Sequence, residues 1–379
     1  MWIAIGVLSL VIWLVLLLRR GGFWLFREVI ERDDLLAPEG QRMPAVAAII
    51  PARDEAETIR QAVQSLLASR YAGPLHVFVV DDHSSDGTGC IARQAGGDHV
   101  TVIPSHALSP AWTGKLWAVA QGVEAASATA PDFLLLTDAD IVHAPDNVAR
   151  LVARAQRDRL DLASVMVRLH CRTLAERFTV PAFVFFFFKL YPPAWIASPR
   201  SRVAGAAGGC ILIRPQALAR IGGIAAIRSE LIDDCALARR VKSTGGRIWL
   251  GLSRDTQSIR PYATFAAVRE MIARTAFTQL RHSALLLAGT LVGMAVIYLA
   301  PPLLLFAPDN VARALGLAAW ILMSAAYTPA LRFYRQPLLL APLLPLTAAF
   351  YTFATIESAV RYWRGSGGMW KGRVQDSKP

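Results

Sequence analysis

The chain is poor in charge and in cysteine, and it contains no internal repeat and no low-complexity stretch. Only 18% of its 379 residues are charged and 54% are hydrophobic, which argues against both an ordinary soluble enzyme and a pure membrane bundle. The cysteines have neither disulfide nor metal-ligand spacing, which argues against a disulfide scaffold and a zinc module. We expect them to be reduced core residues: Cys90, Cys171, Cys210 and Cys235.

Acidic residues are scarce relative to basic ones. The sequence has 28 Asp and Glu against 40 Lys and Arg, and its net charge is +12. A basic chain could bind nucleic acid, but no compact basic run and no nucleic-acid-binding module occurs, so we expect no nucleic-acid partner. An anionic membrane face and an anionic ligand explain the charge with fewer assumptions.

The apolar residues gather at the two ends of the chain. Residues 2–18 form an unbroken apolar run of 17 residues, which is at the short limit for a membrane-spanning helix. The positive charges Arg19, Arg20 and Arg27 follow the run and no cleavage site is visible, so we expect a transmembrane anchor over residues 1–20. The position of these charges predicts a cytoplasmic location for the domain that follows.

Three further apolar segments lie near the C-terminus, at about residues 284–307, 314–331 and 337–356. They predict C-terminal transmembrane helices over residues 284–357, followed by a basic tail at 358–379. Three full crossings would place this tail outside, whereas its basic residues favour the inside: Arg361, Arg364, Lys371 and Arg373. Either the proline-rich last segment is re-entrant or the charge rule fails here.

The middle of the chain, about residues 44–283, predicts an α/β domain. A polar connector at 28–43 leads into it. Strand-like runs then alternate with helical patterns, which predicts a mostly parallel, Rossmann-like sheet. The strands are expected at 45–50, 75–80, 99–103, 132–138 and 162–169, and the helices at 55–69, 86–95, 114–125 and 145–158.

Two segments interrupt this alternation. Residues 181–198 are aromatic and apolar, but Lys189 and two prolines break the run, so it is too short and too broken to span a membrane. We expect an interfacial helix facing lipid there, with a core helix as the alternative. Residues 266–283 mix apolar side chains with arginines and predict a second helix on the membrane surface.

The acidic residues that the chain does have are paired. Asp81-Asp82 and the Asp138-Ala-Asp140 segment each follow an apolar strand directly, and Asp233-Asp234 lie in a later helix. Ligands bind at the carboxyl ends of the strands in open α/β sheets. Carboxylates gathered there repel one another unless a cation joins them. A divalent metal that carries a diphosphate explains the arrangement.

Five segments occur in the order found in family 2 glycosyltransferases: IIPARDEAETI, VVDDHSSDGT, TGKLWAV, LLTDAD and IDDCALARR. The resemblance covers about residues 44–283, and the flanking apolar segments match the membrane-bound members. The layout is similar to that of ceramide-glucosyltransferase-type enzymes and, more closely, to the hopanoid-biosynthesis-associated glycosyltransferases of bacteria. The resemblance implies a GT-A fold in a multi-pass protein of the inner (cytoplasmic) membrane, with the catalytic domain in the cytoplasm.

A nucleotide-sugar, UDP-linked in this interpretation, is the expected donor. Glu55 could bond its base or ribose, or instead stabilise a helix dipole as a first-turn acid. Lys115 at a helix start suits a phosphate, with a solvated lysine as the alternative. The full set expected to bind the donor is Pro51, Ala52, Glu55, Asp81, Asp82, Lys115, Asp138 and Arg281.

The Asp138-Ala-Asp140 segment is a DxD pattern. Alternation in an extended segment would point both carboxylates to one face. The resemblance implies that Asp140 binds Mg²⁺ or Mn²⁺ and that Asp138 binds the ribose or the metal. A solvated loop acid is the alternative, and His143 is either an additional ligand or a surface residue.

The catalytic pair implied by the resemblance is Asp233 and Asp234, with Asp234 as the general base. Adjacent like charges do not stabilise a helix, and the pair is not expected in a first turn, so a solvated helix face is the less attractive alternative. An inverting transfer needs one carboxylate to take the acceptor proton and needs no covalent intermediate. The glycine-rich segment 205–214 could admit an acceptor or form a tight turn.

One departure from the family pattern concerns the Gln/Arg-x-x-Arg-Trp motif that holds the diphosphate in many membrane members. The corresponding segment here is TQLRHS, with His282 in place of the tryptophan and Gln279 one residue too close to Arg281. Arg281 could still contact phosphate. The departure argues against a polymerase and favours the transfer of a single sugar.

The sequence therefore predicts an inverting, metal-dependent glycosyltransferase that moves one sugar to a hydroxyl of a membrane lipid, with a hopanoid suggested by resemblance alone. A polyprenyl-phosphate glycosyltransferase is the close alternative. A membrane assembly protein with an inactive transferase domain is the alternative from another class, and the intact Asp140 and Asp234 argue against it. A transporter is disfavoured, because the apolar segments carry ionisable residues only near their ends.

Overall fold

The computed structural model describes residues 1–32, 42–370 and 373–376 of the chain. It divides into two compact units. The sheet unit consists of residues 28–170 and 195–260, and the helical unit of residues 1–27, 171–194 and 261–379. This division differs from the expected domain over 44–283, because residues 171–194 and 261–283 belong to the helical unit.

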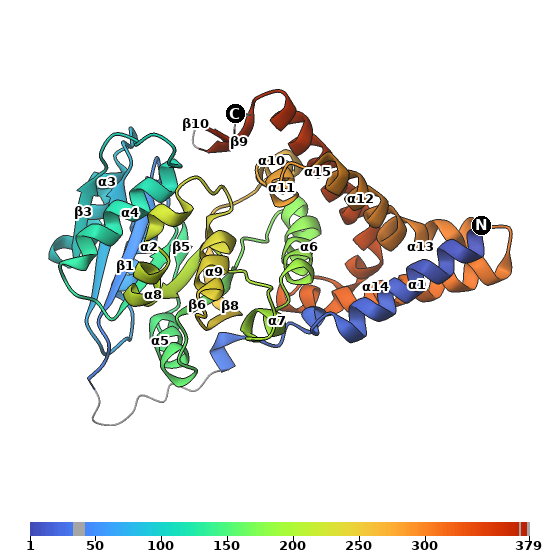
Figure 1. The fold of residues 1–379 in the computed structure, drawn as a ribbon, viewed down its shortest axis with the longest axis horizontal. Helices are drawn as coiled ribbons and strands as arrows, with labels where there is room; N and C mark the ends of the chain where they lie inside the picture. The colour runs from blue at the N-terminus through green and yellow to red at the C-terminus, as the bar shows by residue number, and fades with distance from the viewer. Residues whose placement is uncertain (33–41, 371–372, 377–379) are drawn as a thin grey trace. The chain divides into compact units, whose positions relative to one another are not determined.

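In the described part of the sheet unit, eight strands form one sheet in the order β3-β2-β1-β4-β7-β6-β8-β5 (Figure 1). Neighbouring strands are parallel except where β7 or β5 takes part, so the expectation of a mostly parallel sheet is confirmed. The strands are β1 (Val46–Ala52), β2 (Leu75–Asp81), β3 (Val100–Pro104), β4 (Phe133–Thr137), β5 (Ile141–Val142), β6 (Leu162–Arg168), β7 (Cys210–Ile213) and β8 (Ile248–Ser258).

The strand order places a topological switch point between β1 and β4. From β1 the chain adds β2 and β3 on one side, and it then returns to add β4 on the other side of β1. In such sheets the connections leave the two strands in opposite directions, and ligands bind in the crevice outside their carboxyl ends. Residues 53–57 (RDEAE) follow β1 and residues 138–140 (DAD) follow β4, so the fold brings two of the expected site segments together.

Helices cover both faces of the sheet because alternate strand residues point to opposite faces. Ala48 and Ile50 of β1 belong to a buried cluster that includes Ile59 of helix α2. On the other face, helix α4 approaches β1 so closely that a Cβ at Gly122 would lie 2.5 Å from Ile49 Cγ2. The helices of the sheet unit are α2 (Ile59–Leu67), α3 (Thr88–Gly96), α4 (Gly114–Ser127), α5 (Asn147–Arg157), α8 (Pro215–Arg220) and α9 (Asp233–Ser243), and α7 (Pro193–Ala197) begins just before residue 195.

The start of the expected polar connector packs on the sheet. Val29 forms a parallel bridge with Leu252 of β8, and the Glu28 carbonyl accepts a hydrogen bond from the Leu252 N–H at 2.6 Å. The Glu31 carboxylate accepts hydrogen bonds from the N–H groups of Arg254 and Asp255. Residues 28–32 are therefore part of the sheet unit, and residues 33–41 of the connector lie outside the described residues.

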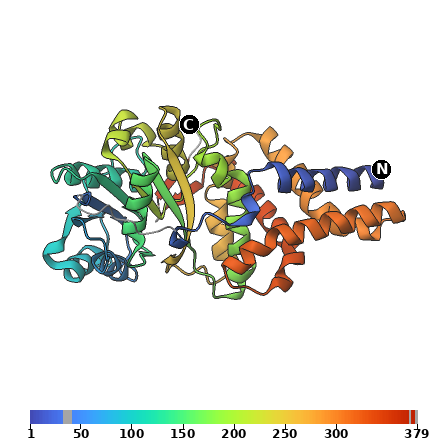
Figure 2. The same ribbon diagram turned by 90° about the horizontal axis from the view of Figure 1, so that it is seen from below.

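The helical unit contains the apolar segments. Among the described residues, five helical runs are long and apolar enough to cross a membrane: Trp2–Arg19, Leu174–Ala197, Ala284–Phe306, Asn310–Phe333 and Leu338–Trp363. Figures 1 and 2 show α1 (Trp2–Arg19) beside α14 (Asn310–Phe333). The other helices of the unit are α6 (Leu174–Leu190), α10 (Phe265–Ala273), α11 (Ala276–Gln279), α12 (Ala284–Met294), α13 (Ala300–Leu303) and α15 (Leu344–Trp363).

Helix α6 is longer than the sequence pattern suggested. It begins at Leu174, where Thr173 and Glu176 form a capping box, and it continues through Pro181. Phe185 and Phe188 are buried against aromatic side chains of the same unit. The expectation of a short, broken segment at 181–198 is thus wrong about length, because the polar first turn hid the start of the helix, and its contact with lipid stays a prediction.

The other expected boundaries near the C-terminus also shift. The surface helix expected at 266–283 is two helices, α10 and α11, separated at residues 274–275. Helix α15 runs to Trp363, so the first residues of the expected tail are helical, and β9 (Gly367–Trp370) pairs antiparallel with β10 (Arg373–Asp376). Lys371 lies outside the described residues.

The cysteines are free, as expected, but they do not share one environment. Cys210 and Cys235 are buried in the sheet unit, whereas Cys90 is exposed and Cys171 is half-buried. The core expectation is therefore confirmed for two positions and wrong for Cys90. Cys90 lies on the outward side of α3, a feature that single-residue reasoning does not reveal.

Candidate active site

The loops that follow β1 and β2 are joined to each other by side-chain hydrogen bonds. The N–H groups of Asp54, Glu55 and Ala56 donate to side chains of the loop at residues 84–88, at 2.8–3.0 Å. Helix α2 begins only at Ile59. The expected helix N-terminus at PARDEAE is therefore a closed turn, and these three N–H groups already have partners.

Pro51 and Ala52 are still part of β1. Ala52 is buried, and its carbonyl accepts a hydrogen bond from the Asp82 N–H at 2.8 Å. Pro51 lines a pocket described below. Pro51 and Ala52 were both expected to present their backbone to the nucleotide. The Ala52 carbonyl is instead hydrogen-bonded to Asp82, whereas Pro51 borders the pocket.

Asp81 ends β2 and Asp82 follows it, but the two carboxylates have different surroundings. Asp81 is half-buried, and its Oδ1 accepts a hydrogen bond from the Ser84 N–H at 3.0 Å. Asp82 is only 1% exposed, and Arg53 Nη1 lies 3.5 Å from its Oδ2 and 2.8 Å from its carbonyl oxygen. Asp81 is therefore the more accessible of the two carboxylates expected to bind the nucleotide.

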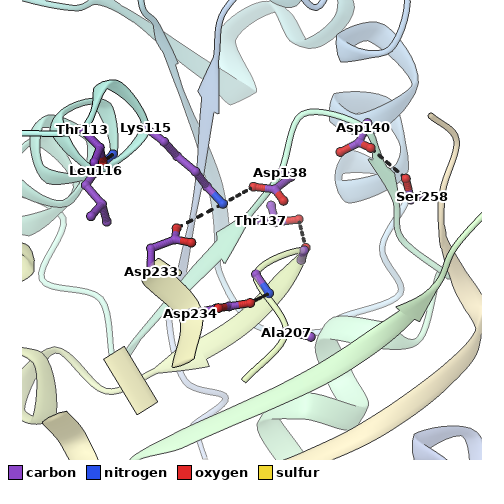
Figure 3. A network of polar contacts seen from close by, with 12 residues as sticks. Thr113, Lys115, Leu116, Thr137, Asp138, Asp140, Ala207, Asp233, Asp234 and Ser258 are labelled. Carbon is purple, nitrogen blue, oxygen red and sulfur yellow. Dashed lines mark hydrogen bonds and ion pairs between the residues drawn. The ribbon is translucent and has the colours of Figure 1, made fainter. Parts of the chain in front are cut away.

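Lys115 is the centre of the first acidic cluster. Thr113 caps α4 by accepting a hydrogen bond from the Leu116 N–H, and this turn directs Lys115 across the end of the sheet (Figure 3). Its Nζ lies 2.9 Å from Asp138 Oδ1 and 3.2 Å from Asp233 Oδ2. Burial lowers the pKa of Lys115, but the two carboxylates outweigh burial and raise that pKa above its usual value. The ammonium group is therefore a fixed positive charge.

Asp234 lies beside this cluster without bonding to Lys115. Its Oδ2 accepts a hydrogen bond from the Gly208 N–H at 2.9 Å, and its Oδ1 accepts one from the Cys235 N–H at 2.6 Å. Burial raises the pKa of Asp234 to about 6, Asp233 raises it as well, and Lys115 opposes both. A carboxylate in this state takes a proton near neutral pH more readily than an ordinary aspartate.

The acidic pair occupies the first turn of α9, which begins at Asp233. The expectation that the pair is not in a first turn is wrong, because the preceding GGIAAIRSE segment forms a turn and a 3-10 helix that ends before Ile232. Carboxylates at this position interact favourably with the helix dipole. Helix-end stabilisation explains Asp233 and Asp234 together, but it does not explain the raised pKa of Asp234.

The glycine-rich segment forms one wall of the site. Ser164 of β6 holds its backbone, because Ser164 Oγ accepts from the Ala207 N–H at 2.9 Å and donates to the carbonyls of Ala207 and Cys210. Thr137 Oγ1 donates to the Gly209 carbonyl at 2.8 Å. These contacts place the Gly208 N–H where Asp234 accepts from it. A Cβ at Gly208 would lie 3.4 Å from Asp234 Oδ2, which is van der Waals contact.

The DxD segment is a turn rather than an extended strand. The Ile141 N–H donates to the Asp138 carbonyl at 3.2 Å, so Asp138 points to Lys115 while Asp140 points to β8 (Figure 3). The expectation that both side chains share one face is therefore wrong. Asp140 Oδ2 accepts a hydrogen bond from Ser258 Oγ at 2.7 Å and lies 3.3 Å from Arg260 Nε.

Arg260 also contacts Glu55. Its Nη2 lies 2.6 Å from both carboxylate oxygens of Glu55, and the Thr58 hydroxyl donates to Glu55 Oε2 at 3.0 Å. Glu55 precedes α2 by four residues, so it is not a first-turn acid. Arg260 and Ser258 were missed by sequence reasoning, because the segment DTQSIRP at the end of a strand carries no recognisable motif.

His143 is neither a surface residue nor available to a metal through its ring nitrogens. It is 4% exposed, its Nε2 lies 3.0 Å from Thr137 Oγ1, and its Nδ1 lies 2.9 Å from Asn147 Nδ2. Burial lowers the pKa of His143 to about 4, so the ring is neutral. Its function in the fold is to connect β4 to the start of α5.

Lys115 and three carboxylates border an open pocket. The polar lining consists of Lys115, Asp138, Asp233, Asp234 and Thr137, and Gly208 and Pro51 complete its rim. The apolar wall comprises Leu116, Val119, Leu136, Ile211, Ile224, Ile227 and Leu237. Glu55, Asp81, Asp82 and Asp140 do not line this pocket, so the carboxylates expected at the site fall into two groups on the same edge of the sheet.

Among the described residues, no group of three or more His, Cys, Asp or Glu side chains has the arrangement of a metal site. The hard oxygen donors of Asp138 and Asp140 nevertheless suit Mg²⁺ or Mn²⁺, because such ions often take one or two carboxylates and complete their shell with substrate phosphates. Each of these carboxylates is already paired with a cationic side chain: Asp138 with Lys115, and Asp140 with Arg260. The carboxylate oxygens of Asp138 and Asp140 therefore fit a divalent ion that arrives with a diphosphate.

Arg281 lies in the helical unit, with its side chain exposed and its backbone at φ 52°. The TQLRHS segment around it makes packing contacts in that unit. Gln279 exchanges hydrogen bonds with the Tyr191 hydroxyl, and the His282 ring stacks on Tyr362 with centroids 4.0 Å apart. The histidine that replaces the family's tryptophan thus has a packing partner, and the contact of Arg281 with a phosphate stays a prediction.

Comparison with known proteins places this geometry in a family. Residues 44–278 match the family described as Glycosyltransferase like family 2. A 4,4'-diaponeurosporenoate glycosyltransferase of Staphylococcus haemolyticus (strain JCSC1435) is 33% identical over 122 residues, 31% of this chain and 31% of that protein. An N-acetylglucosaminyltransferase of Mesorhizobium japonicum is 30% identical over 125 residues, 31% of this chain and 27% of that protein. The chain spans about a third of the curated relatives it matches.

A solved structure resembles the whole chain in fold. The mannosyltransferase PcManGT from Pyrobaculum calidifontis, determined in complex with GDP-Man and Mn²⁺, aligns over 98% of this chain and 100% of that one, with a TM-score of 0.54 and 18% identity. At this identity the likeness concerns the fold alone. The family match covers more than half of the 379 residues and includes every carboxylate of the pocket, so the chain belongs to glycosyltransferase like family 2.

Proposed function

We propose that the protein is an inverting glycosyltransferase that transfers one sugar from a nucleotide-sugar, UDP-linked, to a hydroxyl of a membrane lipid. The Asp234 carboxylate is the observation that carries this proposal. It borders the pocket near the sheet's switch point, it accepts from two backbone N–H groups, and its pKa is raised to about 6. A group with such a pKa can act as a general base near neutral pH.

In the proposed reaction, the acceptor hydroxyl attacks the anomeric carbon from the face opposite the nucleoside diphosphate. One C–O bond forms, the bond to the diphosphate oxygen breaks, and the hydroxyl proton passes to Asp234. Lys115, which Asp138 and Asp233 hold in place, balances negative charge at the pocket. In this scheme Asp233 is a positioning residue for Lys115 rather than a second base.

We propose that Asp138 and Asp140 hold a divalent cation together with the donor. The cation would supply positive charge to stabilise the leaving diphosphate. Support comes from the oxygen donors of the two side chains and from PcManGT, which was determined with GDP-Man and Mn²⁺. Glu55, Asp81 and Asp82 remain the proposed nucleotide ligands, with Asp81 the most accessible of them.

The lipid acceptor is supported by the apolar helices of the chain. Five of the described helical runs could cross a membrane by length and composition. One relative is named a 4,4'-diaponeurosporenoate glycosyltransferase. A hopanoid acceptor rests on resemblance alone, and a polyprenyl phosphate is the competing acceptor.

We propose that α6 does not cross the membrane, although its length and composition would allow it. Strand β6 precedes α6, β7 follows it, and the two strands are hydrogen-bonded neighbours in one sheet. A helix that crossed once would place these strands on opposite faces of the bilayer. The segment must therefore enter and leave on the same side, which we take to be the cytoplasmic one from the arginines after α1.

The test is a transfer assay with the purified full chain in lipid extract, offered a panel of UDP- and GDP-sugars with and without Mn²⁺. Mass spectrometry of the lipids identifies the product. We expect a metal-dependent glycolipid whose acceptor has lost a hydroxyl proton. A glycosylated polyprenyl phosphate would support the competing acceptor. No product with any donor, together with no nucleotide binding, would favour an inactive assembly protein.

A further inference from the structure

A single arginine contacts two of the carboxylates that lie outside the pocket and are proposed to bind the donor or its cation. Arg260 contacts Glu55 and Asp140, which are each 9% exposed. These acids come from the loop after β1 and the turn after β4, on either side of the switch point. Arg260 therefore provides positive charge at the position where the DxD carboxylate would receive a divalent ion.

The two contacts of Arg260 differ in strength. Its Nη2 lies 2.6 Å from each Glu55 oxygen, whereas its Nε lies 3.3 Å from Asp140 Oδ2. Ser258 Oγ binds the same Oδ2 at 2.7 Å, so both contacts to Asp140 fall on one oxygen and Oδ1 takes part in neither. The contact to Asp140 is the weaker one, and it can break while Ser258 keeps the carboxylate in place.

From this arrangement we propose that Arg260 is the resident counter-ion of the donor site and competes with the divalent cation for Asp140. The inference rests on the proposed function, because it assumes that Asp140 receives the cation. Before the donor arrives, the guanidinium balances the buried acids and lowers the affinity of the site for metal. When the cation enters with the diphosphate, Arg260 leaves Asp140 and keeps its bond to Glu55.

The physical reason is repulsion between two cations on one carboxylate. Burying two unbalanced acids costs free energy, so the donor-free site needs a positive charge. A metal ion bound to Asp140 with the guanidinium in place would face a like charge across one carboxylate. The diphosphate supplies negative charge for both cations, so metal binding becomes more favourable when the donor is present. Arg260 has the freedom to move, since 34% of its side chain is exposed.

The test is a Mn²⁺ titration of the donor-free full chain in detergent or nanodiscs, followed by the EPR signal of free Mn²⁺. We expect Arg260→Gln to bind Mn²⁺ about tenfold more tightly than the wild type, because the competing charge is gone. Asp140→Asn in the same background should abolish the gain. With UDP-sugar present, the difference between Arg260→Gln and the wild type should shrink.

Two variants control this experiment. Arg220→Gln removes another guanidinium of the sheet unit, which lies 2.8 Å from Asp161, and it should leave Mn²⁺ affinity unchanged. Arg260→Lys keeps the charge but cannot span both acids with a planar fork, so its Mn²⁺ affinity should lie between those of the wild type and Arg260→Gln. This variant preserves the test if thermal unfolding shows that Arg260→Gln does not fold.

Equal donor-free Mn²⁺ affinities for the wild type, Arg260→Lys and Arg260→Gln would overturn the counter-ion proposal. Donor-dependent transfer by the wild type would then leave the proposed function intact. If the wild type neither binds a nucleotide-sugar nor forms product, the proposed function fails instead, whatever the EPR result. A gain in Arg260→Gln that Asp140→Asn does not remove would show that the metal binds elsewhere, which also overturns the proposal.

Discussion

Two cationic side chains at the same edge of the sheet, Lys115 and Arg260, pair differently with the acidic side chains around them. Lys115 bonds to Asp138 and Asp233, and it leaves Asp234 to two backbone N–H groups. Arg260 bonds to Glu55 and to Asp140. The first cluster therefore contains one carboxylate outside the ion pairs, whereas in the second both acids are in ion pairs.

This difference separates the chemistry from the binding. Burial raises the pKa of Asp234 to about 6, so its carboxylate is ionised near neutral pH and can still accept a proton, which is what a general base requires. Glu55 and Asp140 supply carboxylate oxygens that already contact a guanidinium, and such oxygens suit a ligand that brings its own cation. The comparison supports our proposal that the cluster around Lys115 transfers the proton and that the cluster around Arg260 binds the donor.

The largest expected effect comes from Asp234→Asn. Loss of the base should lower transfer by about 10³-fold, while nucleotide binding, measured by calorimetry, survives. Because the folded state holds the pKa of Asp234 above its unfolded value, ionised Asp234 opposes folding above pH 6. The variant should therefore unfold at the same or a higher temperature than the wild type. Normal turnover would remove Asp234 as the base.

Lys115→Met should lower kcat/KM by about 10²-fold, because the pocket loses its fixed positive charge. The same change should move the acid limb of the pH profile upward, since Lys115 now lowers the pKa of Asp234. Rates measured from pH 5 to 9 test both effects. Arg220→Gln is the matched loss of a charge elsewhere in the sheet unit. A fall in rate without movement of the acid limb would show that Lys115 does not lower the pKa of Asp234.

For the wild type, transfer should rise with pH and level off above about 6. The base must be ionised to accept the proton, so below the pKa of Asp234, at about 6, the rate should fall by about tenfold per pH unit. Initial rates at saturating donor and acceptor give this limb. A profile that stays flat down to pH 4.5 would contradict a base with a raised pKa.

The smallest effect is expected for Ser258→Ala. Asp140 loses one hydrogen bond of 2.7 Å but keeps its place in the turn, so the apparent KM for the donor at limiting Mn²⁺ should rise by about fivefold. The value of kcat should change little, because Ser258 lies in the binding cluster. A loss of kcat as large as that of Lys115→Met would mean that the two clusters do not have separate roles.

Much of the fold followed from hydrophobic patterning. The apolar runs before Asp81 and Asp138 are strands, Gly114 begins a helix, and the three C-terminal apolar segments are helices. The start of helix α6 was not predicted because it is polar. Glu176, which is part of the capping box, is buried, although a glutamate in a sequence suggests a surface residue. A pattern of apolar residues cannot register a buried carboxylate that is satisfied by backbone N–H groups.

The site was less predictable than the fold. Sequence order identified the acidic pairs, but it placed Asp138 and Asp140 on one face, and a turn separates them. Sequence order also did not predict that Arg260 pairs with Glu55, because the two residues are 205 positions apart along the chain. Contacts of this separation depend on strand order, which local patterns do not contain.

The sequence by itself determined which chemistry is available: three acidic pairs, a lysine at a helix start, and apolar ends suited to a membrane. The tertiary structure alone decided how the charges are distributed. It joined Lys115 to Asp138 and Asp233, joined Arg260 to Glu55 and Asp140, and left Asp234 to backbone donors. The reason is that a pKa depends on burial and on charges a few ångströms away, and these neighbours come from segments far apart in sequence.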